Sequence, residues 1–250
     1  MLASPRLFSL YACAMKSVAI LQYYWQDGTG FFETHLRARG VPWRLYRLFD
    51  GEAAPEALSD FGGLAILGGP MSVNDDLPQL RAGERLVAEA LRDDVPVLGH
   101  CLGGQMLSKV AGGAVTRAPI VEIGWSQIAA TDSPLARHWF GTERFPMFQW
   151  HNETFSLPAG AELIATGVHC AQQAFVFGVR HIGMQFHCEM DEFKVNLWLD
   201  PHGRDDIAHH AASLGVQTPA QIVEQSPALL VQSQRIAAAI YDRWIEAQAQ

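Results

Sequence analysis

The sequence predicts an α/β protein with a mostly parallel central sheet and helices on both faces. Short apolar runs alternate with helical patterns through the first half of the chain, which is the arrangement of a parallel sheet with helical crossovers. A chain of 250 residues can bury about three quarters of the surface that it exposes when unfolded, so one large domain needs no metal or disulfide. Such sheets place their sites at the carboxyl ends of strands.

Four apolar runs predict the parallel strands of the core. Each run is short, and each is followed by a turn-forming or helical segment. The predicted strands cover residues 17–24, 43–49, 64–67 and 95–98.

Helices are predicted between these strands. The first runs from about Thr29 to Arg39 and stops at Gly40, where a left-handed cap is easy. The second runs from Leu77 to about Arg92 and separates the third strand from the fourth.

The second half of the chain is first β-rich and then helical. Further strands that complete the sheet and add a hairpin are predicted within 114–128, 145–155 and 173–189. A helical tail is expected from about residue 192, with a polar stretch at 201–210 and a long covering helix at 219–247.

One domain is expected over residues 15–250, preceded by an N-terminal extension at 1–14. The extension has one arginine and a short apolar stretch, so a signal peptide is the alternative interpretation. An extension is favoured because Met15 directly precedes the first strand, and translation could begin at either Met1 or Met15. No apolar run approaches the ~18 residues of a membrane helix.

Composition argues against several classes of partner. Hydrophobic residues make up 49% and charged residues 18%, and the net charge is −8 with lysine and arginine scattered, so nucleic acid is not expected. The four cysteines are widely spaced and form no C-x-x-C pair, which argues against zinc or a redox dithiol. We therefore predict a cytoplasmic protein with reduced thiols, no cofactor and no metal.

The segment from Gly99 to Gly103 predicts a nucleophile. It places Cys101 between a strand and a helix in the pattern G-x-C-x-G, a nucleophile elbow with cysteine in place of serine. The glycines avoid collisions in a sharp turn, and the helix N-terminus favours a thiolate. The alternative is a small buried cysteine at a tight junction.

A base and an orienting acid are predicted near residue 187. His187 and Glu189 lie two apart on a predicted strand, so both side chains would point to the same face and could act together on Cys101. A core histidine and a surface acid are the separate alternatives. The amides of Gly69 and Leu102 are candidates for an oxyanion hole, although Gly69 could belong to an ordinary turn.

These motifs carry a family resemblance. The chain resembles the triad-type class I glutamine amidotransferases from about residue 18 to 190, and it is similar to the glutaminase domain of GMP synthase. The matching segments are LGGPMS (67–72), LGHCLGGQ (98–105) and GMQFHCE (183–189). The resemblance implies a flavodoxin-like fold with C-terminal helices added.

The resemblance also implies a reaction. Cys101 would attack the side-chain amide of glutamine, release ammonia and leave a glutamyl thioester, with His187 as base and then acid and Glu189 as its orienter. Gly69 and Leu102 match the oxyanion hole of the family. The implied substrate-binding residues are Met71, Ser72, Gln105, Trp150, His151 and Asn152.

Two positions depart from the family pattern. Cys188 stands where the family has proline between the histidine and the acid, and His100 stands where an apolar residue is usual. Neither departure removes a catalytic group, but the second brings another imidazole near the site.

Several functions stay open at this stage. A γ-glutamyl peptidase would cut the same linkage in larger compounds, and a synthase activity would require a synthetase or ammonia-acceptor partner in trans. A noncatalytic partner subunit of a synthetase is a further alternative. An α/β-hydrolase is disfavoured because its acid precedes its histidine. A metal site is disfavoured against a solvated polar segment; its residues would be His202, Asp205, Asp206, His209 and His210.

Overall fold

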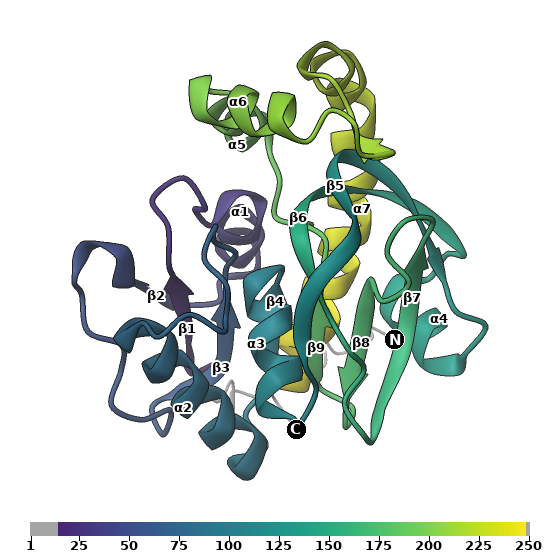
Figure 1. Cartoon of the computed structure of the whole chain (residues 1–250). Helices are drawn as coiled ribbons and strands as arrows, with labels where there is room; N and C mark the ends of the chain where they lie inside the picture. Colours follow the sequence, from purple (N-terminus) through teal and green to yellow (C-terminus); the bar gives the residue numbers. More distant parts are fainter. Residues whose placement is uncertain (1–14, 249–250) are drawn as a thin grey trace, which may run out of the picture.

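The computed structural model describes residues 15–248 (Figure 1). The predicted N-terminal extension at 1–14 lies outside the described residues. The strands are β1 (Ser17–Gln22), β2 (Trp43–Arg47), β3 (Phe61–Ile66), β4 (Val97–His100), β5 (Val115–Ala130), β6 (Arg144–Phe155), β7 (Ala161–Gly167), β8 (Ala174–Phe177), β9 (His181–Met184) and β10 (Gly215–Val216). The helices are α1 (Gly30–Arg39), α2 (Pro78–Asp93), α3 (Leu102–Val110), α4 (Pro134–Phe140), α5 (Glu192–Trp198), α6 (Pro201–His209) and α7 (Pro219–Ala247), with a 3₁₀ turn η1 (Leu48–Asp50).

The sheet has a parallel half and an antiparallel half. Its order is β10-β5-β7-β8-β9-β4-β3-β1-β2, and β6 pairs with β5. Strands β2, β1, β3, β4 and β9 are parallel to their neighbours in that half, whereas β9, β8, β7, β5 and β6 pair antiparallel. The predicted α/β class is confirmed, and the parallel half carries the strands that were predicted for the core.

Helices cover both faces of the sheet (Figure 1). The alternation of β1 shows this, because Val18 and Ile20 join an apolar cluster with α1, α4 and α7. Ala19 and Leu21 point the other way and join a cluster with α2 and α3. A strand with apolar residues in both directions is typical of a sheet that is buried on both faces.

The C-terminal region covers the end of the sheet where the parallel strands finish. Helices α5 and α6 lie beyond this end, and α7 runs along one face (Figure 1). The long helix has the predicted bounds, and it begins with a capping box between Thr218 and Gln221. Within residues 15–248, none of the helices combines the length and the apolar character that crossing a membrane requires.

One local prediction was wrong. His187 and Glu189 do not lie on a strand, because the predicted strand at 173–189 divides into β8 and β9, and β9 ends at Met184. Beyond Met184 the sheet pairing stops, apart from a single bridge between His187 and Phe148 of β6. The shared direction of the two side chains therefore comes from a hydrogen bond in an irregular segment and not from the alternation of a strand.

Candidate active site

Cys101 occupies a strained turn between β4 and α3. Its backbone has φ 47° and ψ −103°, outside the regions that a residue with a Cβ favours. The Cys101 amide donates to the Met184 carbonyl of β9 at 2.8 Å, which ties the turn to the sheet. A Cβ on Gly99 would lie 2.4 Å from the Gly103 backbone, so this turn closes only with glycine there.

His187 and Glu189 form a buried pair beside Cys101. The His187 Nδ1 and Glu189 Oε1 atoms are 2.7 Å apart, and both side chains are almost fully buried. The His187 ring packs edge-on against Trp198 of α5, with 4.7 Å between the ring centres. His187 and Cys101 line the same cavity, so the structure brings the predicted nucleophile and base together at its wall.

Lys194 of α5 completes the surroundings of Glu189. Its Nζ donates to Glu189 Oε1 at 2.7 Å, to Asp27 Oδ1, and to the Gly28 carbonyl at 3.0 Å. The sequence analysis missed Lys194 and Asp27. They are separated by 167 residues, and no local spacing pattern connects them.

The charges of this cluster shift its pKa values strongly. Burial works against a charged His187, but the neighbouring Glu189 and Cys101 outweigh it and raise the pKa of His187 from 6.5 to about 10. Burial likewise opposes ionisation of Glu189, yet Lys194 and His187 hold its pKa well below the usual range. Burial is also outweighed at Lys194, whose pKa is raised by Asp27 and Glu189. At neutral pH His187 is therefore an imidazolium beside the Cys101 sulfur.

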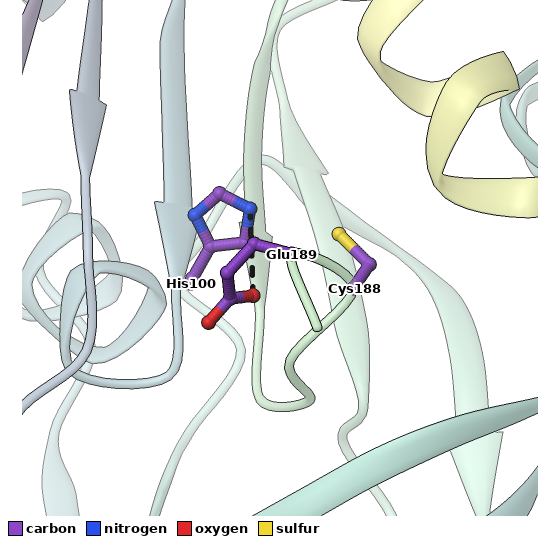
Figure 2. Close-up of side chains that lie close together, drawn as sticks. All are labelled: His100, Cys188 and Glu189. Carbon is purple, nitrogen blue, oxygen red and sulfur yellow. Dashed lines mark ion pairs between the residues drawn. The ribbon is translucent and has the colours of Figure 1, made fainter. Parts of the chain in front are cut away.

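The two departures from the family pattern, His100 and Cys188, both lie close to Glu189 (Figure 2). His100 Nε2 lies 3.8 Å from Glu189 Oε2 and 3.2 Å from the Tyr241 hydroxyl of α7. Cys188 Sγ lies 3.3 Å from the same hydroxyl. Burial lowers the pKa of His100 and raises that of Cys188, so both side chains are uncharged at neutral pH.

A cavity of about 510 Å³ opens over Cys101 and His187. The predicted substrate-binding residues all line it: Met71, Ser72, Gln105, Trp150, His151 and Asn152. Gln105 is held in place, because its side-chain amide donates to the Glu153 carbonyl at 3.2 Å.

The proposed oxyanion donors lie beside each other at the nucleophile. Gly69 lines the cavity, and a Cβ on it would approach the Leu102 side chain to 3.2 Å. Leu102 is the first residue of α3, so its amide has no acceptor within the helix. This arrangement can offer two amides to a negative oxygen formed next to Cys101.

Helix α6 and its C-cap contribute residues that were not predicted to line this cavity. His202, Asp206 and His210 line it, and Asp206 accepts a hydrogen bond from the Trp150 indole at 2.7 Å. Their spacing of four residues places them on one helix face, which is the signal that could have revealed them. Of the residues considered for a metal site, Asp205 and His209 do not line the cavity. Among residues 15–248, the groups of candidate metal ligands that converge on one point contain none of these five residues.

Comparison with known proteins agrees with this fold. Residues 32–193 match the family model "Glutamine amidotransferase class-I". A crystal structure of a glutamine amido transferase from Methylobacillus flagellatus superimposes with a TM-score of 0.90 at 38% identity, covering 93% of this chain and 95% of that one.

Three curated relatives show the range of activities named in the family. The glutamine amidotransferase-like protein YfeJ of Salmonella typhimurium is 29% identical over 73% of this chain and 79% of its own length. A glutamine-hydrolysing GMP synthase subunit of Saccharolobus solfataricus is 31% identical over 54% and 71%. Gamma-glutamyl peptidase 3 of Arabidopsis thaliana is 26% identical over 74% and 77%.

The family match spans most of the chain and contains Cys101, His187 and Glu189. The protein therefore belongs to the class I glutamine amidotransferases. The predicted resemblance, including that to the glutaminase part of GMP synthase, is confirmed.

Proposed function

We propose that this protein hydrolyses the side-chain amide of glutamine, or of a γ-glutamyl compound, through a thioester on Cys101. The observation that carries the proposal is a cysteine at the wall of a cavity beside a buried histidine whose pKa is raised by Glu189. Glu189 accepts the hydrogen bond of His187 Nδ1 at 2.7 Å and so directs the other ring nitrogen toward the reaction.

The reaction follows from these positions. The Cys101 sulfur attacks the amide carbon, and the carbonyl oxygen becomes an anion that the amides of Gly69 and Leu102 stabilise. The carbon–nitrogen bond breaks as His187 gives its proton to the leaving nitrogen, which departs as ammonia or an amine. Water then attacks the thioester and gives a proton to His187, and glutamate leaves as the carbon–sulfur bond breaks.

The size of the cavity favours γ-glutamyl compounds as a second candidate substrate class. One water fills roughly 10–15 Å³ of such a volume, so about 510 Å³ exceeds what the ten non-hydrogen atoms of glutamine require. The part of the cavity under α6, with His202, Asp206 and His210, is available for a leaving group larger than ammonia.

A protein partner is the third element of the proposal. Some relatives are named as subunits of GMP synthase, so an ammonia acceptor could be a synthetase that binds this chain in trans. The set of nucleophile, base, acid and oxyanion donors argues against a purely noncatalytic role. The three described cysteines are unpaired, which fits a reducing compartment such as the cytoplasm.

Glutamate release tests the proposal. Purified protein would be given glutamine and a panel of γ-glutamyl amides, and a glutamine-analogue affinity label would be located by mass spectrometry. We expect a label on Cys101 and turnover of at least one compound. Turnover that survives the substitution Cys101→Ala, or no label and no turnover with any compound, would contradict the proposal.

A further inference from the structure

Lys194 is buried, and removing its charged ammonium from water costs free energy. Its side chain is 3% exposed, on the short helix α5, and it makes ion pairs with both Asp27 and Glu189. A buried ammonium is tolerated only where it is paired and hydrogen-bonded. The structure satisfies that condition with the carboxylate that orients His187.

The two oxygens of Glu189 have different surroundings. Oε1 lies 2.7 Å from His187 Nδ1 and also 2.7 Å from Lys194 Nζ. Oε2 has no hydrogen-bond partner among residues 15–248, and it faces the uncharged His100 ring at 3.8 Å. Apart from His187 itself, Lys194 is thus the cation that contacts the carboxylate.

We propose that Lys194 is a positioning residue of this active site, which holds Glu189 in place and ionised so that Glu189 can orient His187. The inference rests on the proposed function, because it assigns Lys194 a part in the same reaction. Lys194 itself lies behind the acid and does not line the cavity over Cys101.

The rest of α5 supports this role. Asp191 caps the helix by accepting a hydrogen bond from the Lys194 amide at 2.7 Å. The Lys194 ammonium lies 4.8 Å from the centre of the Trp198 ring, and Trp198 packs against His187. One short helix therefore fixes the histidine and its acid together.

Lys194 and His187 are the positively charged groups that lower the pKa of Glu189 most. The groups that face the carboxylate are His100 of β4, Tyr241 of α7, the adjacent Cys188, His187, Lys194 and Asp27, whose carboxylate lies within 4.8 Å of the nearest Glu189 oxygen and His187 nitrogen. The pKa of Glu189 is held low and the pKa values of Lys194 and His187 are raised, so these three groups are charged at neutral pH. Without Lys194, Glu189 would take up a proton more readily, and His187 would lose its anionic partner as the pH falls.

The test is to measure kcat/KM as a function of pH and to compare the low-pH side of the profile (the acid limb), where activity is lost as the pH falls. The substitution Lys194→Met should move the pH at which activity is half lost upward by one unit or more. Lys109→Met is the matched control, because Lys109 also forms an ion pair, with Glu84 at 2.9 Å, but lies on α3 away from Glu189. Its normalised profile should coincide with that of the wild type.

A second variant controls for the possibility that Lys194→Met lowers activity through misfolding. Lys194→Met leaves Asp27 buried without its cation, so the double variant Asp27→Asn/Lys194→Met removes that unpaired charge as well. It should show the same upward shift of the acid limb. Thermal unfolding would establish that each variant is folded.

A second readout needs no substrate. Alkylation of Cys101 by iodoacetamide, followed by mass spectrometry across the pH range, should show the same displacement of its acid limb. Wild-type alkylation without turnover of any compound would count against the proposed hydrolysis, and the alkylation profile would still decide the role of Lys194. An acid limb that is unchanged in folded Lys194 variants, with only a lower rate, would overturn the inference.

Discussion

Two of the buried groups of one cysteine, one histidine and one glutamate among residues 15–248 have a member on the cavity wall, and they differ in what surrounds them. The Cys101 group contains Cys101, His187 and Glu189, and its sulfur faces the cavity. The Cys170 group consists of Cys170, His151 and Glu122, whose candidate ligand atoms lie within 4.8 Å of one another. Its histidine lines the cavity, but its sulfur does not.

The difference lies in charge and direction. Glu122 Oε2 accepts hydrogen bonds from His151 at 3.1 Å and from the neutral Gln173 amide at 2.9 Å, whereas Glu189 has a lysine in the corresponding role. The Cys170 sulfur contacts the Thr154 hydroxyl at 3.3 Å, and burial raises the pKa of this thiol. The two groups therefore share residue types but not surroundings: a strained turn at the cysteine and a buried cation beside the glutamate distinguish the Cys101 group from the Cys170 group.

Removing the two sulfurs should give the largest contrast. We expect Cys101→Ala to lower kcat by about 10⁴-fold or more, since loss of a nucleophile removes the covalent route. Cys170→Ala should change kcat by less than about threefold, because the Cys170 sulfur does not line the cavity and makes only weak hydrogen bonds, including one donated to the Gln172 carbonyl at 3.3 Å. Steady-state glutamate release measures both, and equal losses would remove the distinction between the groups.

Neutralising the two acids should give the next contrast. Glu189→Gln should lower kcat by about 10³–10⁴-fold, because the His187 ring loses its orienting charge, as for the acid of other triads. Glu122→Gln should cost less than about tenfold in kcat while lowering the free energy of unfolding by about 1–3 kcal/mol. If Glu122→Gln lowered kcat by more than tenfold while the protein kept its wild-type stability, the Cys170 group would take part in catalysis.

The stability of the protein should depend on His187 at alkaline pH. The pKa of His187 is about 10 in the folded state and 6.5 ordinarily, so its contribution is fully present below pH ~6.5 and is lost as the pH rises toward 10. Urea unfolding at pH 7 and pH 10 should show a decline on the order of 1–3 kcal/mol that His187→Gln reduces. His151→Gln is the matched control and should leave the decline unchanged.

The smallest effect is expected from the neutral donor of the second group. Gln173→Leu removes one hydrogen bond to Glu122 and should lower the free energy of unfolding by about 1–2 kcal/mol, measured by urea unfolding. Unlike Lys194→Met, it should leave the acid limb of kcat/KM in place. A shifted limb would mean that the two groups are coupled through the cavity wall.

Local sequence patterns predicted most of the helices and strands of this fold, and they also predicted several residues of the candidate site. Apolar runs and glycine turns located the parallel strands, and the elbow pattern located Cys101 in its strained turn. The long helix α7 was predicted at its observed bounds, although Pro227 lies inside it. Strands β1 and β2 end two residues earlier than predicted, at Gln22 and Arg47, since burial alone does not determine where pairing stops.

The remainder of the site depends on contacts between distant segments. His187 and Glu189 were identified correctly as neighbours, but on a strand that the chain does not form there. The pairing of Lys194 with Asp27 and the meeting of His100 with Tyr241 join segments separated by more than one hundred residues. Contacts between residues so far apart follow no regular spacing, so a single sequence does not predict them.

The backbone of Cys101 implies a trade-off between stability and function. A non-glycine residue at φ 47° and ψ −103° stores strain that the surrounding fold must support. Glycine would adopt the same dihedral angles without a Cβ, so Cys101→Gly would relieve the strain and remove the sulfur in one step. Selection for thermostability alone would therefore favour glycine in this turn, and a cysteine there is consistent with the proposed use of its sulfur.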